Sequence, residues 1–255
     1  VSLREQAQTD PDFFLQQFPP PLFIDEVQYA PELFPWIKLR VDKADKFGQY
    51  WLSGSQHFPL MRGLQESLAG RVGVVTLYGL SQGEADGRPL APQPFVPGQT
   101  LGTAETKPVA EVMERIWRGS FPALAASPAL AREDFYGSYI QTYLDRDVRG
   151  LFGVEKIRDF HGVLELLAAR TAQELNMSAL ARDAGVSVNA VKGWLSVLEG
   201  SGIIFFLRPY FTNIAKRLSK TPKVYFTDTG LAAYLTKWHC RPLQPYIQND
   251  KNNLN

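Results

Sequence analysis

Short apolar runs alternate with longer amphipathic segments over the first third of the chain. Residues 22–25 (LFID), 50–55 (YWLSGS) and 72–80 (VGVVTLYGL) are apolar runs of strand length and predict buried strands. Between them, residues 31–46 and 60–70 carry apolar side chains at intervals of three and four, which predicts helices. Strand, helix, strand, helix, strand is the order of a parallel sheet with right-handed crossovers.

This periodicity is lost at residues 80–108, where glycine and proline are dense and a long loop or linker is predicted. Beyond it, residues 109–117, 132–152 and 157–175 show helical spacing that is typical of a small helical bundle. We therefore expect five regions: an α/β unit at 1–85, a linker at 86–108, a helical bundle at 109–170, a helix-turn-helix region at 171–236 and a polar tail at 237–255.

The segment MSALARDAGVSVNAVKGWLSVLEG predicts two helices joined by a tight turn. The first runs from Met177 to Asp183 and stops at Gly185, and Ser187 is placed to cap the second. The expected inward stripe of the second helix is Val188, Val191, Leu195 and Leu198. Two short helices with a glycine turn predict a helix-turn-helix, and the alternating runs at 203–210 and 223–228 predict a hairpin that would serve as the wing of a winged helix.

Cations gather in and around this hairpin, whereas the formal charge of the whole chain is only +1. Five bases and no acid lie between positions 208 and 223. A basic hairpin beside a recognition helix favours duplex DNA, because phosphate contacts dominate such binding. The candidate DNA-binding residues are Ser187, Asn189, Lys192, Ser196, Arg208, Lys216, Arg217 and Lys220. The alternative is a module for docking a protein, with the cations lining a homo-oligomer interface.

Composition narrows the class of protein further. Hydrophobic residues make up 45% of the 255 residues, enough to bury a core in one large domain or two smaller ones. The longest apolar runs fall well short of the roughly 20 residues that cross a bilayer, and no charged and then apolar leader opens the chain, so we expect a cytoplasmic protein with no membrane partner. One cysteine and three histidines do not supply the cluster that a zinc site needs.

Polar side chains follow the first two predicted strands. Asp25 and Glu26 end the first run, and Ser53 and Ser55 end the second. Because the carboxyl ends of parallel strands meet at one edge of a sheet, these side chains are expected to emerge together. Two neighbouring carboxylates can divide the work of ATP hydrolysis, with Asp25 holding Mg²⁺ and Glu26 polarising the attacking water. The alternative is that the two acids only cap the following helix.

Arg71 lies directly before the third apolar run, after the predicted helix at 60–70. From there a guanidinium can reach a nucleotide held by a neighbouring subunit and stabilise charge on the transferring phosphoryl group. The alternative is a surface cation at a helix end. The sequence order of carboxylate pair, hydroxyl and arginine is what favours the catalytic interpretation.

Residues 19–38, 50–58 and 64–84 resemble a widespread prokaryotic family of AAA-type P-loop ATPases, whose C-terminal part is an uncharacterised domain with a helix-turn-helix. The resemblance extends over residues 2–236. It implies an α/β parallel-sheet ATPase core, here incomplete, followed by an all-helical region and a winged helix-turn-helix. It also implies ATP and Mg²⁺ as cofactors, with Asp25 and Glu26 as the Walker B pair, Ser53 or Ser55 as the sensor and Arg71 as the arginine after the sensor helix.

The sequence departs from that family in one respect: it contains no Gly-Lys dipeptide. A P-loop needs glycines and that lysine to cradle the phosphates. In relatives the P-loop lies upstream of the residues that match the start of this chain, and a further domain usually follows the residues that match its end. The missing P-loop is therefore explained either by truncation of the sequence or by a degenerate member of the family. We expect either part of an ATPase that rearranges nucleic acid or a partner, or a non-catalytic winged-helix binding module on an ATPase-like scaffold.

Overall fold

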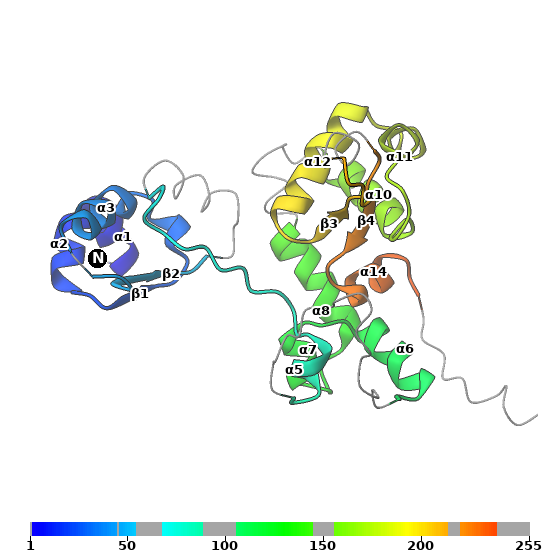
Figure 1. Cartoon of the computed structure of the whole chain (residues 1–255), viewed down its shortest axis with the longest axis horizontal. Coiled ribbons are helices and arrows are strands. Elements are labelled where there is room, and N and C mark those ends of the chain that lie inside the picture. The colour runs from blue at the N-terminus through cyan, green and yellow to red at the C-terminus, as the bar shows by residue number, and fades with distance from the viewer. Residues whose placement is uncertain are drawn as a thin grey trace, which may run out of the picture. The chain divides into compact units, whose positions relative to one another are not determined.

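The computed structural model describes residues 2–44, 46–54, 68–88, 106–144, 156–213 and 220–238. The chain divides into two compact units, Val1–Leu77 and Tyr78–Asn255, which Figure 1 draws in blue to cyan and in cyan to orange. The division falls a few residues before the end of the α/β unit expected from the sequence. Within the described ranges, no helix combines the length and the apolar character needed to span a bilayer.

The first unit is a small parallel sheet with helices. In chain order it contains α1 (Leu3–Thr9), α2 (Pro11–Gln17), β1 (Leu22–Ile24), the 3-10 helix η1 (Val27–Tyr29), α3 (Leu33–Lys43) and β2 (Tyr50–Leu52). Helix α2 begins at Pro11, where the Asp10 carboxylate accepts from the Phe13 N–H at 3.0 Å and proline holds the first helical position. The predicted strands at 22–25 and 50–55 and the helix between them are confirmed, with bounds shifted by a few residues.

Strands β1 and β2 run parallel in a register that pairs Leu22 with Tyr50, Phe23 with Trp51 and Ile24 with Leu52. Leu22 and Ile24 pack on a core that includes Leu15, Leu33, Phe34 and Ile37. Phe23 and Trp51 lie on the opposite face and remain exposed. The two strands, predicted to be buried, are therefore covered on one face only by the described residues.

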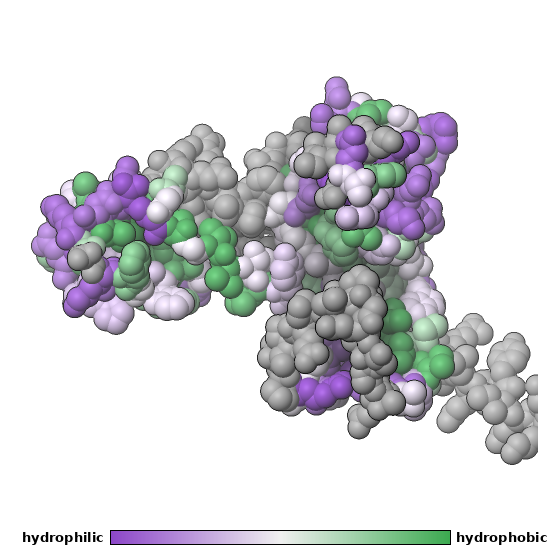
Figure 2. All heavy atoms as spheres, in the orientation of Figure 1, coloured by the Kyte–Doolittle hydropathy of each residue, from purple (hydrophilic) through white to green (hydrophobic). Residues whose placement is uncertain are grey.

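The predicted third strand is wrong. Residues 72–78 form neither a helix nor a strand, and their apolar side chains are exposed, with 83% of Val75 and 92% of Leu77 accessible. Figure 2 shows hydrophobic residues in green at the surface. An apolar run supplies the side chains of a buried strand, but hydrogen bonding to a neighbour is what makes the strand, and the described residues supply none. The predicted helix at 60–70 lies mostly outside the described residues.

The second unit is mostly helical, with a small antiparallel pair of strands. Its elements are α5 (Gln82–Ala85), α6 (Val109–Arg118), α7 (Pro122–Ala126), α8 (Arg132–Tyr139), the π-helix η2 (Ile140–Leu144), α10 (Ile157–Ala168), α11 (Met177–Ala184), α12 (Val188–Gly200), β3 (Ile204–Leu207), β4 (Lys223–Phe226) and α14 (Thr229–Leu235). Its core is formed by α10, α12 and α14 with β3 and β4 packed beside them, and its largest buried side chain is Trp194.

Helices α11 and α12 form as the sequence predicts. Asn176 caps α11, Gly185 takes the left-handed turn at φ 70°, and the Ser187 hydroxyl oxygen accepts from the Ala190 N–H at 3.1 Å to cap α12. Val191, Leu195 and Leu198 are buried as expected, whereas Val188 is 43% exposed. Val188 is the first residue of α12, one turn before the helix reaches the core, so its inward assignment is wrong. The two predicted strands are confirmed as the antiparallel pair of β3 and β4, and their role as a wing stays a prediction.

Asp228 joins three parts of the second unit. Its buried carboxylate caps α14 through the Leu231 N–H at 2.7 Å, accepts from the Tyr136 hydroxyl at 2.7 Å, and accepts from both the N–H and the hydroxyl of Ser120 at 2.6 and 2.8 Å. Burial raises the pKa of the Tyr136 hydroxyl far above its usual range, which keeps it a donor. At Gly119 a Cβ would lie 2.1 Å from that hydroxyl, so only glycine fits there.

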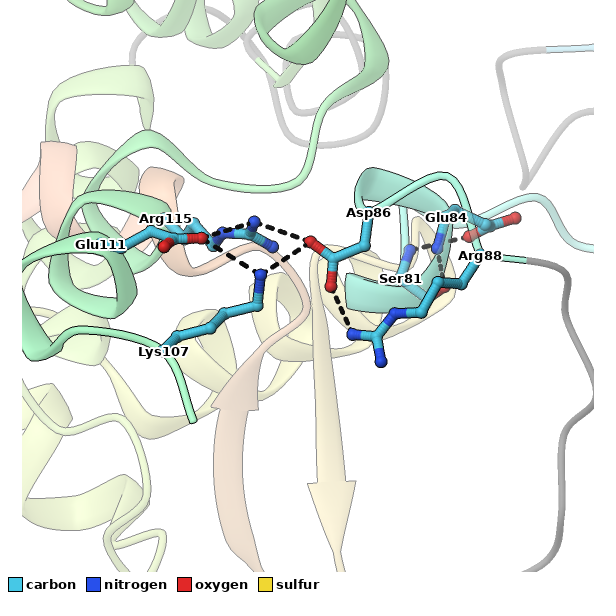
Figure 3. A network of polar contacts seen from close by, with 7 residues as sticks. All are labelled: Ser81, Glu84, Asp86, Arg88, Lys107, Glu111 and Arg115. Carbon is cyan, nitrogen blue, oxygen red and sulfur yellow. Dashed lines mark hydrogen bonds and ion pairs between the residues drawn. The ribbon is translucent and has the colours of Figure 1, made fainter. Parts of the chain in front are cut away.

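An ion-pair network attaches the start of the second unit to α6 (Figure 3). The carboxylate of Asp86 pairs with Arg88, with Lys107 at 2.9 Å and with Arg115 of α6 at 2.7 Å, and Glu111 also pairs with the last two. Hydrogen bonds from these bases hold the pKa of the Asp86 carboxyl well below its usual range. Residues 86–88 and 106–108 of the predicted linker are thus held against the helical unit, while residues 89–105 lie outside the described residues.

Removing the Asp228 carboxylate should destabilise the second unit more than removing an exposed cap. Asp228→Ala leaves the N–H groups of Ser120 and Leu231 without their acceptor in a buried place, and we expect it to lower the free energy of unfolding by about 3 kcal/mol. Asn176→Ala deletes an exposed cap and should cost about 1 kcal/mol. Urea unfolding followed by circular dichroism measures both, and equal losses would contradict the role of Asp228.

Candidate functional site

The carboxyl ends of β1 and β2 bring together Asp25 and Ser53, which are 28 positions apart. The ladder continues past the strands, because the Ser53 N–H donates to Ile24 O and the Val27 N–H donates to Ser53 O, both at 3.0 Å. This pairing sets the Ser53 hydroxyl against Oδ1 of Asp25, to which it donates a hydrogen bond. The sheet therefore produces the contact between carboxylate and hydroxyl that the alternation of strands and helices predicts.

Asp25 is exposed, and its hydrogen bonds converge on one oxygen. Oδ1 accepts from the Ser53 hydroxyl and from the Glu26 N–H, the latter at 3.1 Å. Among the described residues Oδ2 has no hydrogen-bond partner. Mg²⁺ takes one or two carboxylates together with phosphate oxygens and waters, so an exposed carboxylate oxygen beside a hydroxyl fits its donor chemistry. No group of three or more histidines, cysteines or acids is placed to bind a metal in the described part of the chain. The role of Asp25 as a Mg²⁺ ligand stays a prediction.

Glu26 has a left-handed backbone, with φ 53° and ψ 42°. This conformation costs a non-glycine residue about 1–2 kcal/mol and is uncommon. Glu26 occupies the N-cap position of η1, but its side chain makes no capping hydrogen bond there. The Glu26 carboxylate instead accepts from the side-chain amide of Gln28, a buried residue that our sequence analysis did not single out.

A cavity of about 420 Å³ opens beside the acid pair, between α1 and β1. Its lining is mostly apolar and includes Arg4, Phe14, Phe18, Phe23, Asp25 and Glu26. Arg4 is the one cation among the described lining residues, and its guanidinium lies 4.4 Å from the centroid of the Tyr29 ring. The volume falls within the range of ligand pockets. Sequence reasoning missed Arg4 because nothing in the local pattern links residue 4 to the strand that begins at Leu22.

Arg71 pairs with Asp42 near the end of α3 and donates a second hydrogen bond to Ala69 O at 3.1 Å. The hydrogen bond to Asp42 raises the pKa of the guanidinium. Among the described residues, no hydrogen bond or ion pair joins Arg71 to Asp25, Glu26 or Ser53. Its action on a neighbouring subunit stays a prediction, and Ser55, the other candidate sensor, lies outside the described residues.

On α12, the predicted DNA-binding residues Ser187, Asn189, Lys192 and Ser196 are all exposed. Two of these side chains already make hydrogen bonds to the backbone of α12. Ser187 is the N-cap, and the Ser196 hydroxyl donates to Lys192 O at 3.0 Å. Asn189 and Lys192 are thus the candidates for contact with an external partner. Arg208 and Lys220 are exposed near the ends of β3 and β4, while Lys216 and Arg217 lie outside the described residues.

The left-handed turn at Glu26 should be measurable as backbone strain. Glu26→Gly and Glu26→Ala both remove the carboxylate and its hydrogen bond to Gln28, but only glycine adopts φ 53° without strain. We expect the glycine variant to be more stable than the alanine variant by about 1 kcal/mol in urea unfolding. An alanine variant as stable as the glycine variant would contradict a strained turn.

Comparison with known proteins finds a family match in each of the two units. Residues 1–85 match an AAA domain, and residues 109–241 match a domain of unknown function, DUF8612. Two uncharacterised proteins, from Mycobacterium tuberculosis and Mycobacterium bovis, are each 30% identical over 212 residues, which is 82% of this chain and 42% of each relative. The chain thus spans less than half the length of these relatives, and no solved structure matches it. The chain belongs to the family of proteins in which an AAA domain is followed by DUF8612.

Proposed function

We propose that this chain is part of an AAA-type ATPase that uses ATP binding and hydrolysis to rearrange a nucleic acid or a partner protein. The observation that carries the proposal is the contact of the Ser53 hydroxyl with the Asp25 carboxylate at the carboxyl ends of paired parallel strands. The contact lies inside the region that matches an AAA domain. Ligands of open parallel sheets bind at this edge.

Each residue of the pair has a separate role in this proposal. Asp25 holds Mg²⁺, directly or through a water, with the Ser53 hydroxyl fixing the orientation of its carboxylate. Glu26 orients and deprotonates the attacking water. Bound MgATP supplies a terminal phosphoryl group whose transfer to water releases free energy. Arg71 is assigned to the nucleotide of a neighbouring subunit in a homo-oligomer. To reach that nucleotide, its guanidinium would leave the ion pair with Asp42 and contact a phosphate instead.

The second unit supplies the part that contacts a target. Helices α11 and α12, joined through Gly185, and the following β3 and β4 pair have the order of a winged helix-turn-helix. The exposed face of α12 offers Asn189 and Lys192, which suit a base edge and a phosphate. Duplex DNA is therefore the target that we assign to α12.

A second candidate function is a non-catalytic binding module that keeps the ATPase scaffold. The observation in its favour is the absence of any Gly-Lys dipeptide from the 255 residues. Backbone N–H groups and that lysine provide most phosphate contacts in P-loop proteins, so residues 1–255 without them are expected to bind a nucleotide weakly. Measurement of nucleotide binding distinguishes the two functions.

The 255-residue chain by itself should bind ATP weakly and turn it over negligibly. We expect phosphate release in the presence of Mg²⁺ and ATP to be the same for the native chain and for Glu26→Gln. Measurable turnover that Glu26→Gln abolishes would prove this expectation wrong. If the coding sequence upstream of Val1 supplies a Gly-Lys-Thr loop in frame, the longer chain should hydrolyse ATP. In that longer chain, Glu26→Gln should slow hydrolysis about 100- to 10,000-fold, while nucleotide binding persists.

Duplex DNA should bind this chain with an affinity that falls as salt rises. Lys192→Ala and Arg217→Ala should each weaken binding and reduce the slope of log affinity against log salt by about 1. Lys43→Ala, which removes an exposed cation from α3 in the other unit, is the matched control and should change neither. Fluorescence anisotropy with a labelled duplex over a salt series provides the measurement. Unchanged affinity with both changes would count against the assignment of α12 and the hairpin.

A further inference from the structure

The two strands of the second unit expose an aromatic face. Side chains alternate across a strand, so Ile204, Val224 and Phe226 point into the core and are buried. The opposite face carries Phe205, Leu207, Lys223 and Tyr225. Phe205 is 44% and Leu207 is 53% exposed. An exposed apolar face on a short strand pair is a candidate interaction surface.

Phe205 and Tyr225 sit directly opposite each other in the register of β3 and β4. Their ring centroids are 5.3 Å apart and their planes differ by only 13°, so the two rings stack. This parallel arrangement presents two neighbouring aromatic side chains in fixed orientation on the outer face of the strand pair. This geometry suits a ligand with a flat group that stacks on an aromatic ring.

Three exposed cations lie on or next to the two strands. Lys223 is on the same face as the rings, Arg208 follows β3 directly and Lys220 precedes β4. Glu174, an acid, forms an isolated backbone bridge opposite Lys223. The cations are available to a ligand that carries phosphate groups.

We propose that the outer face of β3 and β4 binds an unpaired nucleic-acid strand, with bases stacked on Phe205 and Tyr225 and phosphates near Arg208, Lys220 and Lys223. Each nucleotide of a single strand brings a flat ring and a negative charge, which matches the two chemistries on this face. A protein partner would have to bring apolar surface and several acids together. An intact duplex keeps its bases stacked on one another, so it cannot use the rings.

This inference rests on the proposed nucleic-acid role and adds a second form of ligand to it. The exposed residues of α12 suit a duplex, whereas the aromatic face suits a strand whose bases are unstacked. A protein that holds a duplex at α12 and a single strand at β3 and β4 is equipped to bind a junction between paired and unpaired nucleic acid. The two surfaces can be tested separately through side chains that only one of them uses, Lys192 on α12 and Phe205 on β3.

The test measures binding of the full chain to a labelled oligothymidine of about 20 nucleotides and to a labelled duplex. Phe205→Leu keeps an apolar side chain but removes the ring, and we expect it to weaken single-strand binding about 10- to 100-fold. Phe205→Tyr keeps the ring and should bind within about 2-fold of the native chain. Lys192→Ala should weaken duplex binding only. Circular dichroism confirms that each variant is folded, which the exposure of Phe205 leads us to expect.

The outcomes separate this inference from the proposed function. Duplex binding without single-strand binding, or single-strand binding that Phe205→Leu leaves intact, overturns the aromatic site and leaves the duplex proposal standing. Binding of neither nucleic acid overturns both. Dimerisation of the native chain in analytical ultracentrifugation that Phe205→Leu abolishes, without any effect on the oligothymidine, would show that the face binds a second copy and would also overturn the inference.

Discussion

The parallel pairing of β1 with β2, in the register that sets Ile24 beside Leu52, is the constraint on which the candidate site depends. Because the ladder continues to Ser53, the hydroxyl that follows one strand meets the carboxylate that follows the other. A slip of one residue would move Ser53 away from Asp25 and would also turn Leu22 and Ile24 out of the core. Burial of the sheet's inner face thus fixes the geometry of a polar contact at its edge.

The second unit is organised around a polar contact of its own. Asp228 accepts four hydrogen bonds from Ser120, Tyr136 and Leu231, and a buried carboxylate is tolerated because its charge is met by donors. Arg132 packs nearby, its guanidinium 4.5 Å from the centroid of the Trp117 ring and its N–H groups donating to backbone oxygens. Helix α6, which holds Asp86 through Arg115, packs against α14, so the start of this unit is connected to its core.

Two kinds of surface in the second unit carry different chemistry. The exposed side of α12 is polar and offers separate donors, whereas the outer face of β3 and β4 is aromatic with cations at its margins. In the first unit the charged residues at the sheet edge face a mostly apolar cavity with Arg4 in its lining. The charged sheet edge thus belongs to one compact unit and the two surfaces of α12 and the strand pair belong to the other.

The sequence by itself determined the elements whose causes are local. Capping by Ser187, the turn at Gly185 and the buried stripe of α12 follow from neighbouring residues, and the order of strands and helices predicted that Asp25 and Ser53 would share an edge. Only the tertiary structure decided that residues 72–78 pair with no described strand, that Glu26 is held by Gln28, and that Asp228 reaches Ser120. The physical reason is that periodicity and capping act over one or two turns, whereas burial and hydrogen-bond partners are chosen among residues far apart in the chain.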